Sequence, residues 1–422
     1  MIARRQAIRA AVSGVGAAVA LGAIGGRPAR AANPITIGFG MALTGGIAPN
    51  GKAALLAMQI WEADTNAKGG LLGRPVKLIF YDDQSNPSTV PGIYTKLIDV
   101  DKADFVVSGY ATNMVAPAIP VVMQADRLFL GLFGLDANTE FKYPKYFSMN
   151  PAGGPKPREA FARGFFGMAM QQTPKPQNLA IAGADAEYPR NAIEGVLSIA
   201  KEAGLKVVYN RNYPPSTADY TPIVRAIQAT NPDIVFIASY PPDTVGIVRA
   251  AGEVGLKAKI FGGGMVGLQS TAIKVQLGPL MNGIVNYDYF LPWAKYATPE
   301  ALAFLKVYQS KAAGSGVDLL GYYLPPFAYS YMQVLGEAIE ATKSLDNDKL
   351  ADYIRTHSFK TLVGDVKFGP NGEWAEAQVL AVQFQNVKSN DLDQFRDPKT
   401  EVILWPAADK TGEIIYPYTG AK

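Results

Sequence analysis

Short apolar stretches alternate with segments of helical periodicity along most of this chain. In the amino-terminal run we expect strands at 35–43, 76–81, 105–108 and 128–133. Helices are expected between them, at 53–66, 91–100 and 116–124. The strands are continuous apolar runs without polar alternation, which is typical of parallel sheets covered by helices on both faces. The alternation therefore predicts an α/β fold built on doubly wound parallel sheets.

The pattern restarts after a stretch rich in proline and glycine, 151–157, which is typical of a linker. The second run predicts strands at 178–184, 206–209, 233–239 and 259–261, and helices at 160–171, 191–203, 220–229 and 244–254. Gly69-Gly70, Gly204 and Gly255 each follow a predicted helix, as C′ glycines do. Three more helices are expected at 299–313, 327–342 and 349–356, before a tail rich in strands and turns from 366. Two α/β lobes follow from this repetition.

The first 31 residues predict an export signal. Arg4, Arg5 and Arg9 precede an uncharged run at 10–26, and Ala29-Arg30-Ala31 is a small-x-small cleavage site. The Arg4-Arg5 pair leaves the Sec and twin-arginine routes both open. The alternative is a membrane-spanning helix, but the run is short for that role and rich in alanine and glycine. No cysteine is present for lipid attachment. We expect an exported protein without a membrane anchor.

Composition excludes several classes of function. Removing the five arginines of the signal from the 40 basic residues leaves 35, against 36 acidic ones, so the mature chain has no basic excess for nucleic acid. The absence of cysteine excludes disulfides, thiol catalysis and zinc–thiolate sites. A single histidine, His357, argues against a catalytic triad or a multi-histidine metal site. We expect no catalytic residue, no metal and no cofactor.

Two short motifs carry competing interpretations. Residues 262–267 match G-x-G-x-x-G after a predicted strand, with Asp288 downstream as the acid that a dinucleotide ribose would need. Because the motif ends the second run and opens no βαβ unit, a tight turn is the favoured interpretation. Asp82-Asp83 could act as an acid/base pair, but a turn or helix cap is the commoner role after a strand. His357 is expected to interact with the end of its helix.

Aromatic residues at strand ends are the strongest indication of a ligand site. Tyr110, Phe133, Tyr188, Tyr240 and Tyr289 lie at or just beyond the carboxyl ends of predicted strands. In open α/β sheets, ligands bind at that edge. The residues that follow Tyr110 can cap a helix and present backbone N–H groups to an anion.

The segment 66–78 (NAKGGLLGRPVKL) and its continuation 81–87 (YDDQSNP) resemble the periplasmic leucine/isoleucine/valine-binding family of ABC transporters. Further matches lie at 35–45, 204–208, 220–222, 231–233 and 251–257. The resemblance implies a type I periplasmic binding fold, with two lobes joined by three crossovers. It implies 32–152 plus 287–377 for lobe one, and 153–286 plus 378–422 for lobe two. It also implies a periplasmic monomer that holds a small-molecule carboxylate in its cleft and delivers it to a membrane permease.

The resemblance also implies site residues, one turn at a time. Ala111, Thr112 and Asn113 match the turn that holds a ligand carboxylate, and Gly134, Leu135 and Asp136 match the next turn. Lobe two supplies Tyr188 and Tyr240. Family members carry an acid for the ligand ammonium at the position of Gly264-Met265, where this chain has no acid. In the turn after the first strand, family members often have an aromatic residue, and this chain has Asn50 there.

These two departures favour a small amphipathic carboxylate without an ammonium, such as an aromatic or 2-oxo acid. A branched-chain or aromatic amino acid is the alternative, with Asp136 as partner of the ammonium. Two other classes of function stay open at this point. One is an exported nicotinamide-dependent oxidoreductase, and the other is a ligand sensor that reports to a membrane receptor.

Overall fold

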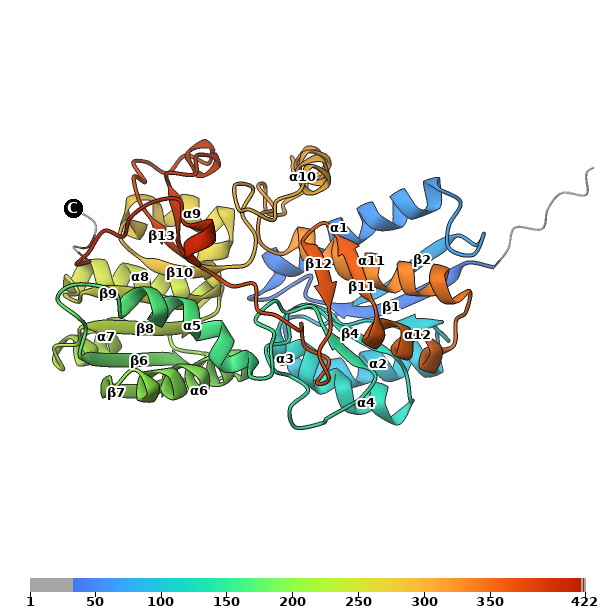
Figure 1. The fold of residues 1–422 in the computed structure, drawn as a ribbon, viewed down its shortest axis with the longest axis horizontal. Helices are drawn as coiled ribbons and strands as arrows, with labels where there is room; N and C mark the ends of the chain where they lie inside the picture. Colours follow the sequence, from blue (N-terminus) through green and yellow to red (C-terminus); the bar gives the residue numbers. More distant parts are fainter. Residues whose placement is uncertain (1–32, 419, 421–422) are drawn as a thin grey trace, which may run out of the picture.

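A computed structural model describes residues 33–418 and residue 420, so the signal expected at 1–31 lies outside the described part. Two α/β lobes lie side by side along the longest axis of the molecule (Figure 1). The chain passes between them three times, after β5 (Tyr146–Ser148), after β10 (Val285–Asp288) and after β12 (Gly364–Lys367). No helix among the described residues is long and apolar enough to cross a membrane.

Lobe one contains the amino-terminal strands and most of the segment between the second and third crossovers. β1 (Ile35–Met41) pairs in parallel with β2 (Val76–Asp82) and β3 (Phe105–Val106), and β4 (Phe129–Gly131) pairs in parallel with β5. A bond from Ser108 N to Leu130 O, 2.9 Å long, joins the two groups of strands. Its helices and its small hairpin are α1 (Ala48–Ala67), α2 (Val90–Asp99), α3 (Thr112–Val115), α4 (Ile119–Gln124), α10 (Pro299–Ala312), α11 (Pro325–Thr342), α12 (Asn347–Thr356), β11 (Ser358–Thr361) and β12.

Lobe two is built on a seven-stranded sheet in the order β14-β13-β10-β9-β8-β6-β7. The strands β6 to β10 pair in parallel, whereas β13 and β14 each pair antiparallel with their neighbour. The sheet is therefore mixed at one edge, where the sequence predicted only parallel strands. Its elements are α5 (Pro157–Ala169), β6 (Asn178–Ala184), α6 (Glu187–Glu202), β7 (Lys206–Tyr213), α7 (Thr221–Gln228), β8 (Ile234–Ser239), α8 (Pro241–Val254), β9 (Ile260–Met265), α9 (Thr271–Leu277), β10, β13 (Leu380–Phe384) and β14 (Glu401–Trp405).

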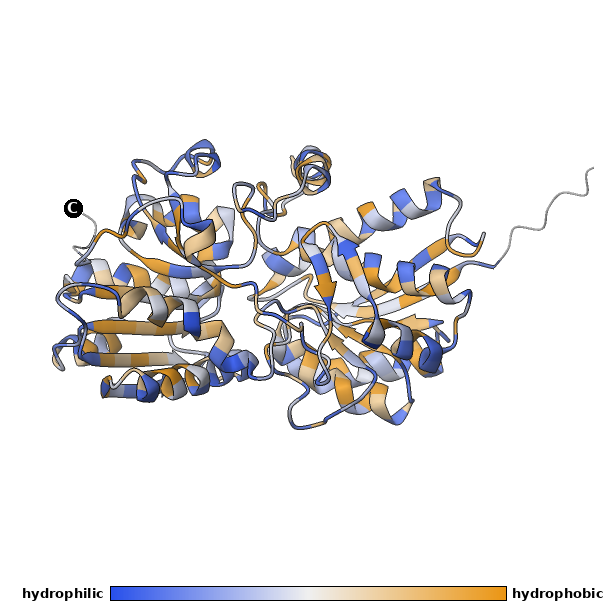
Figure 2. Cartoon of the chain, viewed as in Figure 1, coloured by the Kyte–Doolittle hydropathy of each residue, from blue (hydrophilic) through white to orange (hydrophobic). Residues whose placement is uncertain are grey.

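The predicted periodicities are confirmed in most elements. In Figure 2 the central strands of lobe two are mostly hydrophobic, and the helices beside them carry both hydrophilic and hydrophobic residues. Gly204 and Gly255 have φ of +71° and +66°, as C′ glycines require. The sequence placed the end of this part of lobe two at residue 286. In the structure β10 continues to Asp288, so Tyr287 and Asp288 also belong to the sheet of lobe two.

The glycine motif at 262–267 does not form the tight turn expected from the sequence. Gly262 to Gly264 lie inside β9, which is paired on both sides, with β8 and with β10. A Cβ at Gly262 would stand 1.6 Å from the carbonyl oxygen of Val285 on the neighbouring strand. The motif is therefore required for close packing of backbones within the sheet, and it forms no loop that could hold a pyrophosphate.

Candidate functional site

The carboxyl ends of strands from both lobes face one another, and the loops that follow them form the cleft. After β3, the chain turns through Ala111, whose φ of +86° is rare for a residue with a side chain, and α3 begins at Thr112. The first backbone N–H groups of a helix have no acceptor within it, so those of Thr112 and Asn113 are available to an anion. The Thr112 hydroxyl accepts a hydrogen bond from Leu135 N at 3.0 Å, which fixes its position.

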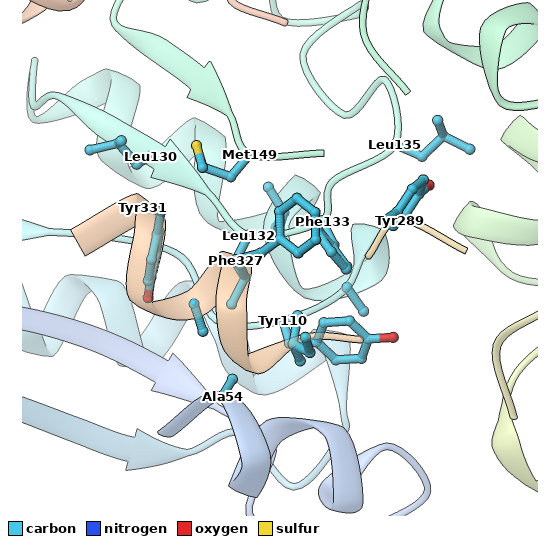
Figure 3. Packing of buried hydrophobic residues seen from close by; sticks show 14 of the residues in the cluster. Ala54, Tyr110, Leu130, Leu132, Phe133, Leu135, Met149, Tyr289, Phe327 and Tyr331 are labelled. Atoms are coloured by element: carbon cyan, nitrogen blue, oxygen red, sulfur yellow. The ribbon is translucent and has the colours of Figure 1, made fainter. Parts of the chain in front are cut away.

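The loop after β4 also contains residues with positive φ angles. Phe133 and Asp136 have φ of +58° and +54°. Strained backbone of this kind persists where the surrounding packing holds it, and it is common at binding sites. The Phe133 ring is held between Tyr289 and Phe327, at centroid distances of 5.1 and 4.9 Å, and Figure 3 shows this arrangement.

Eleven residues enclose a small cavity between the lobes, which we call the inner chamber: Tyr110, Ala111, Thr112, Phe133, Asn150, Tyr188, Tyr240, Val266, Tyr287, Tyr289 and Tyr323. Its volume is about 20 Å³, close to that of a single water molecule. Aromatic rings make up most of the wall, and none of these described lining residues is charged. The chamber is thus an apolar, hydroxyl-lined space that must widen to hold any organic ligand.

Most of the tyrosine hydroxyls of the inner chamber are fixed by hydrogen bonds. The hydroxyls of Tyr287 and Tyr323 lie 2.9 Å apart, Tyr289 donates to Asn150 Oδ1 at 3.3 Å, and Tyr188 donates to Gly264 O at 2.9 Å. Burial raises the pKa of Tyr188, Tyr287, Tyr289 and Tyr323 well above the usual value for a phenol. These residues are therefore neutral, and they offer hydrogen-bonding groups and ring faces without a formal charge.

Besides the Tyr287–Tyr323 pair, three polar contacts join the lobes near the inner chamber. The Tyr240 hydroxyl donates to Asn113 Oδ1, and Asn191 Nδ2 donates to Leu135 O at 2.9 Å. Arg158 Nε lies 2.6 Å from Asp136 Oδ2. Because each contact has one partner in either lobe, the structure represents a closed cleft.

The position expected to carry an acid for an ammonium is closed to side chains. A Cβ at Gly264 would stand 2.6 Å from the Tyr188 hydroxyl and 3.1 Å from Phe161 Cζ. Met265, predicted as a site residue, is fully buried in the core of lobe two, and its backbone bonds the Asn286 side chain. It does not line the chamber, because alternation along β9 turns it into the lobe, and Val266 lines the chamber in its place.

Other predicted residues lie around the chamber and not in its wall. Asn50 is buried beside a separate cavity of about 10 Å³ that Tyr323 also lines, and its Oδ1 has no partner among the described residues. Gly134 and Leu135 shape the loop behind Thr112. Asp136 lines a distinct pocket of about 640 Å³, where it is neutralised by Arg158. It is therefore poorly placed to pair with an ammonium in the chamber.

The mouth of the cleft is a second pocket of about 640 Å³, lined by residues of both lobes. Asn113 and Tyr240 belong to its wall, and Tyr240 also lines the inner chamber. The Tyr240–Asn113 hydrogen bond therefore lies between the mouth and the inner chamber. A ligand can leave the chamber on this side only when that contact separates.

Four lining residues were not predicted as site residues: Asn150, Val266, Tyr287 and Tyr323. Of these, only Val266 belonged to a motif, the glycine motif at 262–267, which was not assigned to the site. Tyr289 was noted as an aromatic residue at a strand end but was not included among the predicted site residues. Tyr287 lies two residues before Tyr289 at the end of β10, so the rule that identified Tyr110 and Tyr289 could also have found Tyr287. Tyr323 lies just before α11, where no strand end marks it.

The remaining motifs have structural roles. Asp82 Oδ1 accepts bonds from Leu43 N, Thr44 N and Gln84 N, which confirms the turn interpretation. His357 Nδ1 lies 2.9 Å from the Tyr353 carbonyl at the end of α12, as expected. Among residues 33–418 and 420, no group of three or more histidine, cysteine, aspartate or glutamate side chains is arranged to hold a metal.

Comparison with known proteins places this architecture. The periplasmic binding protein family matches residues 34–390. Leu/Ile/Val-binding protein homolog 8 of Brucella abortus is 25% identical over 363 residues, covering 82% of this chain and 87% of the relative.

Two solved structures share the fold. One is a solute binding protein of an ABC transporter from R. palustris in complex with benzoate (TM-score 0.71, 16% identity, 85% of this chain and 95% of that one). The other is a branched-chain amino acid transporter substrate binding protein from Streptococcus pneumoniae in complex with isoleucine (TM-score 0.70, 16% identity, 84% and 97%). The chain belongs to the periplasmic binding protein family, and it has the type I fold with two lobes and three crossovers.

Proposed function

We propose that this protein is the substrate-binding component of an ABC importer and that its ligand is a small aromatic carboxylate. The ligand ring lies among the tyrosines of the inner chamber, and its carboxylate accepts from the backbone N–H groups of Thr112 and Asn113. A planar ring suits a wall of aromatic side chains, which provide large contact areas at low entropic cost. The protein acts in the periplasm, reached through the export signal, and hands its ligand to a membrane permease.

The observation that carries this proposal is the closed position at Gly264. A buried ammonium requires an opposite charge or a full set of acceptors. No charged side chain lines the described wall of the chamber, and Gly264 leaves no room for one. The one acid among the predicted site residues, Asp136, is paired with Arg158. Ligands without an ammonium are therefore favoured over amino acids.

The structural neighbours support both ligand classes. One is described in complex with benzoate, a second with 4-hydroxybenzoate and a third with isoleucine. A branched-chain or aromatic amino acid is thus the second candidate, favoured by the Leu/Ile/Val-binding relatives. The three ligands share a carboxylate, and they differ in the presence of an ammonium.

Titration calorimetry with matched pairs distinguishes the two candidates. Phenylpyruvate and phenylalanine differ at the ammonium position, as do 4-methyl-2-oxopentanoate and leucine, and benzoate and 4-hydroxybenzoate extend the aromatic series. We expect the acid without an ammonium to bind more tightly in each pair. Tighter binding of the amino acid in both pairs would refute the proposed ligand class and leave the role as a binding protein intact. Mass spectrometry of molecules released on denaturation would identify a retained ligand directly.

A further inference from the structure

Asp288 lies where the chain leaves lobe two for the second crossover. It is the last residue of β10, and it is 1% exposed. Its Oδ1 accepts from Tyr289 N at 2.6 Å and from Phe290 N at 3.1 Å. One carboxylate oxygen therefore binds the first two backbone N–H groups of the crossover and fixes the direction in which the chain turns.

A buried ion pair lies next to Asp288. Lys274 of α9 and Glu401 of β14 are 2.5 Å apart (Nζ to Oε2), and both are almost completely buried. Burial alone would lower the pKa of Lys274, but the charges of Glu401 and Asp288 raise it above its ordinary value. Burial and the Glu401 charge raise the pKa of Asp288 well above its usual range. The positional role of the Asp288 carboxyl follows from its geometry, because its Oδ1 accepts both backbone N–H bonds at the start of the crossover.

The backbone that Asp288 holds carries two rings of the inner chamber. Tyr287 precedes it and Tyr289 follows it, and their centroids lie 5.1 Å apart. Tyr289 is stacked on Tyr323 with an interplanar angle of 13° and contacts Phe133 in lobe one. A rotation of the chain at Asp288 would therefore move Tyr289 out of the chamber wall and change the shape of the chamber.

We infer that Asp288 is a positioning residue of the ligand site, which holds the start of the second crossover so that Tyr287 and Tyr289 face the inner chamber. The inference depends on the proposed ligand class only in one respect, which is that the binding test uses an aromatic carboxylate as its probe. Asp288 touches no ligand, and it acts through the two tyrosines. The same role explains why a strand end in the core of lobe two carries a carboxyl, where an apolar residue would cost less to bury.

The test compares three variants of the full mature protein with wild type, using benzoate as the probe in titration calorimetry. Asp288→Asn keeps an oxygen that accepts from both N–H groups, so we expect its affinity to stay within about twofold of wild type. Asp288→Ala removes the acceptor, and we expect its affinity to fall at least tenfold. Val224→Ala, in the α7 face of the lobe-two core, controls for lost stability and should leave the affinity unchanged. If Asp288→Ala does not fold, Asp288→Ser replaces it, with an expected loss of at least threefold.

Near-ultraviolet circular dichroism of the ligand-free proteins gives a readout that is independent of the probe. We expect the tyrosine signal to change in Asp288→Ala and to be retained in Asp288→Asn and Val224→Ala. Wild-type affinity together with a wild-type tyrosine signal in Asp288→Ala would overturn the inference. Failure of wild type to bind benzoate or any aromatic acid would refute the proposed ligand class instead, and the dichroism would still decide the role of Asp288.

Discussion

The hydrogen bond between Tyr240 and Asn113 provides a specific test of how closure contributes to affinity. It joins lobe two to lobe one beside the inner chamber. Tyr240→Phe removes only the hydroxyl and keeps the ring in the chamber wall. Tyr188→Phe is its matched control, because the Tyr188 hydroxyl donates to Gly264 O, within lobe two. Both variants remove one tyrosine hydroxyl. In Tyr240→Phe the lost hydrogen bond joins the two lobes, and in Tyr188→Phe it lies within lobe two.

The expected magnitudes follow from the surroundings of each bond. Asn113 lies at the wall of the open mouth, so water can replace the lost hydroxyl and no buried group is left without a partner. The loss is then the net value of one hydrogen bond, about 0.5–1.5 kcal/mol, or an affinity about two- to twelvefold weaker. The oxygen of Gly264 is buried, so Tyr188→Phe should lower the free energy of unfolding by about 1–3 kcal/mol.

Calorimetry measures the affinity of both variants, and thermal unfolding of the ligand-free proteins measures their stability. We expect Tyr240→Phe to weaken ligand binding with little change in the unfolding temperature, because the open state lacks this contact. Tyr188→Phe should lower the unfolding temperature and have a smaller effect on affinity. Equal affinities for Tyr240→Phe and wild type would refute the view that this contact stabilises the closed state.

Small-angle scattering should show a smaller radius of gyration with bound ligand than without it, since two lobes joined by three crossovers close on a ligand; identical curves at saturation would contradict this. Burial, with a smaller contribution from the Asp136 charge, raises the pKa of Glu373 to about 8, so the folded state binds a proton that the unfolded state releases at lower pH. The free energy of unfolding should therefore be unaffected by the Glu373 carboxyl below about pH 4 and should fall as the pH rises from there to about pH 8. Glu373→Gln removes this loss, so at pH 8.5 it should unfold at a higher temperature than wild type. Gly264→Ala should destabilise the protein by about 1–3 kcal/mol through overlap with Tyr188, and a wild-type unfolding temperature would show that the backbone relaxes freely there.

The part of the site that could be predicted from the sequence is the part that depends on strand ends. Tyr110, Phe133, Tyr188 and Tyr240 were found because parallel strands place their carboxyl ends at one edge, and all four line the inner chamber. Thr112 was found through the start of its helix. These features follow from local periodicity, which short apolar runs define well.

The site residues that were predicted wrongly or missed are those whose position depends on the exact register of a strand or on a partner far away in the sequence. The predicted strand at 259–261 was too short because glycines have low strand propensity. Met265 was placed in the site because the family resemblance put the position of an acid at Gly264-Met265, and the register of β9 turns Met265 into the core of lobe two. Tyr323 lies before a helix in a segment far along the chain, and only tertiary packing brings it against Tyr287. The ion pair between Asp136 and Arg158 joins two lobes, so no pattern within one lobe could reveal it.

The connectivity of the two sheets also bears on how the chain acquires its structure. Lobe one needs α11 from the carboxyl-terminal half to cover α1, and lobe two needs β13 and β14, which join its sheet after the excursion through lobe one. Contacts between residues so distant in sequence slow folding, because the chain loses the entropy of closing a long loop before these contacts can form. A chain interrupted before Glu401 would expose the unpaired edge of β13 and leave Lys274 buried without its partner. Synthesis must therefore pass β12 before lobe one is complete, and it must reach β14 before the sheet of lobe two is complete.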